Sequence, residues 1–109
     1  MKGDYLGEFE QIVLAALLRL GENAYGMAVR REIEERATRQ TSIGAVYATL
    51  ERLEAKGYVS SQEGDPTPER GGRAKRFFHI ESDGMRVLRE SQETMRRMMA
   101  GLKTKWSPV

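Results

Sequence analysis

The hydrophobic pattern of this chain changes its period once, at Gly57, and that change constrains the fold more than any other feature. Before Gly57, apolar residues recur at every third or fourth position in three segments, which is typical of amphipathic helices. After it, segments 58–63 and 74–80 carry β-branched and aromatic residues, and residues 64–72 between them include prolines and glycines. The pattern therefore predicts three helices and then a β-hairpin with a long tip.

A fourth helical pattern follows the hairpin. The four helices are expected at residues 6–20, 25–37, 42–56 and 82–103. Ser42 and Ser82 are the expected N-caps, because a hydroxyl oxygen there can accept a hydrogen bond from a free backbone N–H of the first turn. Gly57 is expected to end the third helix, since glycine readily adopts the left-handed conformation found after helix ends.

Composition excludes most catalytic chemistry. The 109 residues include no cysteine and one histidine, His79. Thiolate zinc sites, cysteine nucleophiles, histidine-dependent triads and multi-histidine metal sites are therefore excluded. The acidic residues of segment 32–35 are flanked by arginines at positions 30, 31 and 36 on a solvated helix face. We expect no enzymatic activity, no metal site and no cofactor, and a structural role for His79.

The sequence has no sign of a membrane or secretory segment. The longest uninterrupted apolar stretch, residues 12–18, is far shorter than the roughly 18 residues of a membrane span. The first residues also lack the basic start, apolar stretch and cleavage site of a signal peptide. The expected location is the cytoplasm.

Three helices followed by a two-stranded hairpin with basic residues are the layout of a winged helix-turn-helix. The third helix is therefore the candidate reader of duplex DNA. Its apolar stripe accounts for one face, and the opposite face carries no charge before Glu51, whereas an ordinary solvent-facing helix side is rich in Glu and Lys. Small residues would let the helix backbone approach base edges in the major groove. The small or hydroxyl residues expected on this face are Ser42, Gly44, Ala45, Ala48 and Thr49.

Two tyrosines remain ambiguous. Tyr47 stands at the border of the apolar stripe, so its hydroxyl either reaches a phosphate or is simply half-buried with its ring. Tyr25, at the start of the second helix, has the same alternatives and lies next to free backbone N–H groups, which are ready phosphate donors.

Positive charge gathers in the second part of the chain. Residues 66–109 hold 10 basic and 5 acidic side chains, against 8 and 11 in residues 1–65. Around the hairpin tip, a glycine pair is surrounded by Arg70, Arg73, Lys75 and Arg76. A glycine-rich basic loop can contact phosphates along the minor groove, and the alternative is a merely solubilising turn.

The fourth helix carries an apolar stripe suited to a partner helix. Leu88, Met95 and Leu102 are spaced by seven residues, and Met98 and Met99 fill the same stripe. A seven-residue spacing favours helix pairing, and methionine adapts to irregular partners. The alternative is that the stripe folds back onto its own domain.

Taken in order, these motifs resemble the PadR-like transcriptional regulators, specifically the short members with a single C-terminal helix. The resemblance covers residues 6–88. It rests on Tyr25-Gly26, on residues 42–59 with the sequence SIGAVYATLERLEAKGYV, and on residues 71–80 with the sequence GGRAKRFFHI. The family commonly has an aromatic residue and a threonine after the second strand. This chain departs from that motif with FHIES at residues 78–82, where Ser82 is still able to cap the helix.

The resemblance agrees with the fold that the order of elements predicts, a mainly α fold with a two-stranded β wing. Residues 1–81 would form a winged helix-turn-helix DNA-binding domain, and residues 82–109 a C-terminal dimerisation helix and tail. It also implies a homodimer that represses transcription by binding an inverted-repeat operator in double-stranded DNA. Some short relatives bind flat aromatic drugs through a tryptophan of this helix, but Trp106 lies beyond the expected helix, so that role is not transferred.

The residues and the resemblance together give two sets of candidate site residues. Those for DNA are Tyr25, Ser42, Gly44, Tyr47, Ala48, Thr49, Arg70, Arg73 and Lys75. Those for dimerisation are Phe9, Leu88, Met95, Met98, Met99 and Leu102. A cavity lined by Phe9 and the methionines, holding a small apolar or aromatic effector, is a further hypothesis. The alternative function is a winged-helix protein–protein interaction module that uses the fourth helix as its docking surface.

Overall fold

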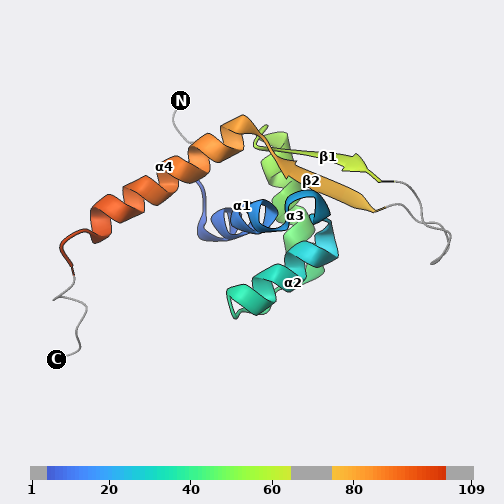
Figure 1. Ribbon diagram of the computed structural model, residues 1–109, viewed down its shortest axis with the longest axis horizontal. Helices are drawn as coiled ribbons and strands as arrows, with labels where there is room; N and C mark the ends of the chain where they lie inside the picture. The colour runs from blue at the N-terminus through green and yellow to red at the C-terminus, as the bar shows by residue number, and fades with distance from the viewer. Residues whose placement is uncertain (1–4, 65–74, 103–109) are drawn as a thin grey trace.

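The computed structural model describes residues 5–64 and 75–102 as a helical body with one β-hairpin (Figure 1). The elements in chain order are α1 (Glu8–Leu20), the 3-10 helix η1 (Gly21–Asn23), α2 (Gly26–Arg36), α3 (Ile43–Ala55), β1 (Val59–Glu63), β2 (Arg76–Ile80) and α4 (Ser82–Met99). The predicted mainly α architecture with a two-stranded sheet is confirmed.

Both predicted ends of α3 are confirmed. The Ser42 side-chain oxygen accepts a hydrogen bond from the Ala45 backbone N–H at 3.0 Å, which caps the helix at its start. At the other end Gly57 has φ +83°, and its N–H donates to the carbonyl of Glu54. The N–H of Tyr58 donates to the carbonyl of Leu53. These two bonds form a Schellman motif, which turns the chain sharply into β1.

α4 begins at Ser82 as expected, but its predicted N-cap and its predicted C-terminal end are wrong. Glu81, rather than Ser82, is the N-cap, and its side chain makes no capping bond. The reason is that the Glu81 N–H donates to the carbonyl of Tyr58 at 2.8 Å, which holds Glu81 in an extended conformation and lets the helix begin at Ser82. At the far end α4 stops at Met99, and Gly101 with φ +79° follows.

The hairpin is anchored to the helices through its second strand. β1 and β2 are antiparallel, with Val59 opposite Ile80 and Ser61 opposite Phe78. The Phe78 N–H donates to the carbonyl of Ala24 at 2.9 Å, and Tyr25 forms an isolated bridge with Phe77. The segment that opens α2 therefore lies along the free edge of β2, and this places α2 directly beside the wing.

One apolar core joins all of these elements. Its fully buried members include Leu14 of α1, Ile33 of α2, Leu50 of α3 and Phe78 of β2. The first turns of α4 contribute as well, through Val87 and Leu88. Beyond them α4 extends away from the other helices (Figure 1), and residues 92–98 are all exposed.

The burial of Leu88 corrects a sequence prediction. Leu88 was expected to face a partner, but only 9% of its surface is exposed and it packs in the core of its own chain. The physical reason is that the start of α4 lies on the hairpin and α1, so the first part of the apolar stripe is covered within the protomer. The alternative, in which the apolar stripe of the fourth helix packs on its own domain, therefore holds for the first turns of α4 alone.

Candidate nucleic-acid interface

The outer face of α3 is a smooth surface of small residues. Ser42, Gly44, Ala45 and Ala48 are all exposed, whereas Val46 is fully buried. The first acidic side chain on this surface is Glu51, in the second half of the helix. A face of this kind lets the helix axis come close to base edges, because no long or charged side chain holds it away.

Thr49 does not belong to this surface, and the prediction that it faces outward is wrong. Only 3% of Thr49 is exposed, and its hydroxyl accepts a hydrogen bond from Arg52 at 3.3 Å. Thr49 follows Val46 by three residues and precedes Leu53 by four, so it shares their buried face. Its side chain cannot touch a base while α3 keeps this packing.

Tyr47 joins α3 to the start of α2. The side chain is half-buried, and its ring centroid lies 6.3 Å from that of Phe78. Its hydroxyl packs against Gly26 so closely that a Cβ atom on Gly26 would overlap it. Position 26 therefore needs glycine for this packing, and Tyr47 fixes α2 relative to α3.

Tyr25 is the residue at which α2, the wing and two cations meet. It is the N-cap residue of α2, and its ring packs edge-on against Phe77 with centroids 5.7 Å apart. The Arg31 guanidinium donates to its hydroxyl oxygen at 3.1 Å, and the Lys75 ammonium nitrogen lies 4.1 Å from its ring centroid. The hydrogen bond from Arg31 is the main reason why the pKa of Tyr25 is below its ordinary value, and the charge of Lys75 acts in the same direction.

Of the predicted wing residues, Lys75 is exposed beside β2, while Arg70 and Arg73 lie outside the described residues. Arg76, also expected in the basic tip, instead ties the wing to the end of α3. It forms an ion pair with Glu54 at 2.8 Å and donates to the Ser61 hydroxyl at 3.1 Å. Since Ser61 in turn donates to Glu54, this triad fixes the wing relative to α3.

A second ion cluster, which sequence reasoning missed, joins α1 to α3. Glu10 is only 7% exposed, and its carboxylate accepts hydrogen bonds from Lys56 at 3.1 Å and from the Gly7 backbone at 2.9 Å. Arg52 lies 3.6 Å from the same carboxylate. Burial raises the pKa of Glu10, but the Gly7 N–H and the two cations outweigh it, so the pKa is below its ordinary value. The signal in the sequence was a glutamate at the third position of α1, typical of a helix N-terminus.

The exposed part of α4 carries the predicted methionines. Met95 and Met98 are 58% and 70% exposed, while Met99 is half-buried. Leu102 is half-buried but lies beyond the end of the helix. Phe9 is half-buried against the core of its own chain, with the Arg39 guanidinium 5.3 Å from its ring centroid.

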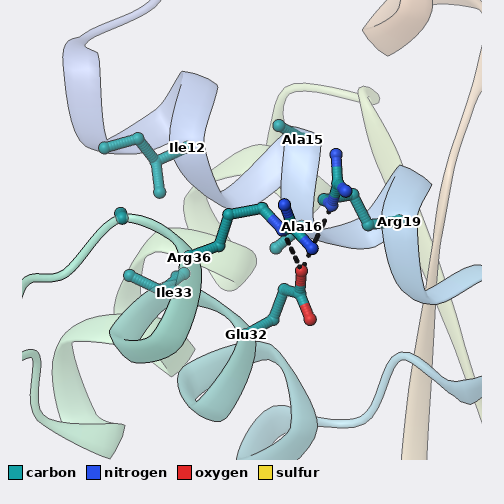
Figure 2. A pocket seen from close by; sticks show the side chains of 8 residues that line it. Ile12, Ala15, Ala16, Arg19, Glu32, Ile33 and Arg36 are labelled. Carbon is teal, nitrogen blue, oxygen red and sulfur yellow. Dashed lines mark hydrogen bonds and ion pairs between the residues drawn. The ribbon is translucent and has the colours of Figure 1, made fainter.

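Two hollows open near these helices. One, of about 300 Å³, lies between the N-terminal segment and α4 and is lined by Leu6, Met95 and Met98 among others, but not by Phe9 or Met99. The other, of about 240 Å³, lies between α1 and α2 (Figure 2). Figure 2 shows Arg19 and Arg36 of the second hollow both turned toward Glu32, at 3.2 and 3.0 Å. Its charged groups are therefore already paired with one another.

Neither membrane nor metal features occur in the described segments. None of the helices there is both long enough and apolar enough to cross a membrane. Residues 5–64 and 75–102 also contain no group of three or more histidine and acidic side chains placed to hold a metal ion.

Comparison with solved structures identifies the fold. A PadR family transcription regulator from Clostridium difficile superposes with a TM-score of 0.71 at 17% identity, over 91% of this chain and 99% of that one. A PadR-like transcriptional regulator from Bacillus cereus gives 0.71 at 16% identity, over 93% of each chain. A winged-helix DNA-binding protein from STIV gives 0.69 at 21% identity, over 89% of this chain and 97% of that one. The fold is therefore a winged helix.

Comparison with protein families identifies the kind of protein. No match was found among curated proteins. The profile of the PadR-like family of transcriptional regulators, however, matches residues 13–90, which run from the middle of α1 to the middle of α4. Members of this family are regulators and not enzymes, as the composition led us to expect. The chain belongs to the PadR-like family of transcriptional regulators.

Proposed function

We propose that this regulator represses transcription as a homodimer that binds an inverted-repeat operator in double-stranded DNA. The observation that carries the proposal is the exposed face of α3, where Ser42, Gly44, Ala45 and Ala48 offer small side chains and no charge. An α-helix of this kind fits the major groove, while the helix before it and a basic wing contact the phosphates on either side. Because it acts on DNA, we also propose a cytoplasmic location.

The second half of α4 supports dimerisation. Met95 and Met98 are large apolar side chains that remain mostly exposed in the single chain. Burying them against a second copy would remove apolar surface from water, which is favourable. In this proposal residues 1–81 bind DNA and residues 82–109 pair the protomers, with Met99, Leu102 and Phe9 at the edge of the contact.

A small-molecule effector is a further part of the proposal. The hollow between the N-terminal segment and α4 is lined by Met95 and Met98, the same residues that we assign to the dimer contact. An apolar or aromatic compound bound there would alter how two copies of α4 pack, and so the distance between their reader helices. This supports a role for the hollow in releasing the protein from its operator.

The test is fluorescence anisotropy with the duplex upstream of the protein's own gene and a scrambled duplex of the same length, each over a salt series. We expect the native duplex to bind at least about a hundredfold more tightly, with affinity that falls steeply with salt. Equal binding to both duplexes would contradict sequence-specific regulation at this site.

The alternative is a winged-helix module that binds a protein through α4. The variant Arg73→Ala/Lys75→Ala separates the two functions. Loss of affinity for DNA in this variant would support the regulator, because phosphate contacts from the wing are then needed. Unchanged affinity would favour the interaction module.

A further inference from the structure

Most cations in the described segments are neutralised by a neighbour. Lysine and arginine side chains there typically form ion pairs with a carboxylate, as Arg30 does with Glu34 on α2. Within residues 5–64 and 75–102 the exceptions are Arg31, Lys75 and Arg89. Uncompensated positive charge on the described surface is therefore confined to few places.

Two of these three cations lie on the same phenol. Arg31 donates to the Tyr25 hydroxyl oxygen at 3.1 Å, and the Lys75 ammonium nitrogen lies 4.1 Å from the Tyr25 ring centroid. Arg31 and Lys75 are exposed and Tyr25 is half-buried, so an incoming anion can reach all three. Arg31 has Glu35 four residues further along α2, yet its contact is with Tyr25 and not with that carboxylate.

The hydrogen-bond chemistry of this cluster suits a phosphate oxygen. Arg31 occupies one lone pair of the Tyr25 oxygen, which leaves the phenolic O–H free to donate to another acceptor. Guanidinium and ammonium groups have further N–H donors and no acceptor. Charge-assisted hydrogen bonds from such donors to an anionic oxygen are about twice as strong as neutral ones.

The location of the cluster points to the DNA backbone. Tyr25 precedes Gly26, against which the Tyr47 hydroxyl of α3 packs, and Tyr25 also contacts Phe77 of the wing. The cluster therefore flanks the reader helix at the junction of α2 with the wing. We propose that Arg31, Tyr25 and Lys75 form one clamp for a single backbone phosphate of the bound duplex. This inference rests on the proposed function, and it adds Arg31 to the DNA contacts.

The test measures affinity and its salt dependence for Arg31→Gln, Lys75→Gln and the double variant, on the native and scrambled duplexes. The matched control is Arg89→Gln, which removes the third unpaired cation, on α4. Each single variant is expected to bind both duplexes about tenfold more weakly, because a charge-assisted contact is lost without any base contact. Arg89→Gln is expected to bind like the unchanged protein.

The double variant distinguishes one phosphate from two. The slope of log affinity against log salt changes by about 0.9 for each phosphate that is no longer neutralised. If both cations hold the same phosphate, the double variant loses about 0.9 in total, and its loss of affinity is smaller than the two single losses combined. A loss of about 1.8, with additive effects, would overturn the single clamp.

Two further arms make the result unambiguous. Tyr25→Phe keeps the ring beneath Lys75 and removes the hydroxyl, so we expect a severalfold loss of affinity with little change in salt slope. Thermal unfolding of each variant identifies loss of binding that is due to misfolding. If the unchanged protein binds DNA but Arg31→Gln behaves like Arg89→Gln, the clamp alone is refuted. If the unchanged protein binds neither duplex, the proposed function is refuted as well.

Discussion

Gly84 lies directly against the carbonyl oxygen of Tyr58, so closely that a Cβ atom at position 84 would overlap that oxygen. Gly84 is in the first turn of α4, and the same carbonyl accepts the hydrogen bond from Glu81 just before the helix. The base of α4 is thus held by backbone contacts. Such contacts leave no room for even the smallest side chain.

Gly84→Ala is therefore expected to destabilise the protein by about 2–3 kcal/mol, because the added methyl group meets backbone that cannot move aside as a side chain could. Urea denaturation followed by circular dichroism measures this. The control is Gly44→Ala, where the nearest atom to a new Cβ is the Ser42 hydroxyl oxygen at 3.9 Å. That change is expected to stabilise the exposed helix by about 0.5–1 kcal/mol. Equal effects at both positions would contradict the packing described at Gly84.

Two valine substitutions on α3 distinguish the exposed face that we propose to contact DNA from the buried face of the same helix. Ala48→Val adds bulk to the exposed face and is expected to weaken binding to the native duplex by about tenfold, as a lost base contact does. Thr49→Val keeps the shape of a buried side chain and removes its bond to Arg52, so DNA preference is expected to be unchanged. Anisotropy on native and scrambled duplexes measures both. A change of sequence preference in Thr49→Val would mean that α3 repacks on DNA.

Glu10 is expected to make stability depend on pH. Its pKa is lowered in the folded protein, so its contribution is fully present above its ordinary value of 4.5 and is lost as the pH falls through the lower folded pKa. Glu10→Gln is expected to cost about 1–3 kcal/mol at neutral pH, because Lys56 and Arg52 lose a largely buried partner. Urea denaturation at several pH values should show that this difference shrinks below pH 4.5. A constant difference for Glu10→Gln over the whole pH range would contradict the cluster's role.

Met98→Glu is expected to prevent dimerisation while leaving the protomer folded. A carboxylate in an apolar contact must be desolvated, which costs several kcal/mol. Analytical ultracentrifugation over a concentration series measures the dimer, and circular dichroism verifies the fold. Arg89→Glu places the same group on another face of α4 as the control. If both variants remain dimeric, the contact lies elsewhere on the molecule.

Local signals predicted most of the fold. Ser42 and Gly57 could be assigned as the ends of α3 because capping depends on a few neighbouring residues, and the order of helices and strands followed from the hydrophobic period. Ser82 failed as a cap because a distant group, the Tyr58 carbonyl, holds Glu81 in place. Propensity within a short window carries no information about such a contact.

The site was predicted less completely. The spacing of Leu88 and Met95 indicates a shared stripe, but spacing cannot tell which part packs on the chain's own core. Thr49 was wrongly placed on the exposed face because its hydroxyl suggests a polar residue, although its position in the helix lies on the buried face. The role that we propose for Arg31 could not be found from sequence at all, since it depends on the wing bringing Lys75 to the same tyrosine.

The contact at Tyr58 also determines how the rest of α4 is aimed. The helix has 18 residues, so it is about 27 Å long, and a tilt of about 10° at its base displaces its far end by about 5 Å. The Tyr58 N–H meanwhile belongs to the turn that ends α3. The base of α4 therefore adjoins the end of α3. A small change of packing at this base would displace Met95 and Met98 by a larger distance, without any substitution near them.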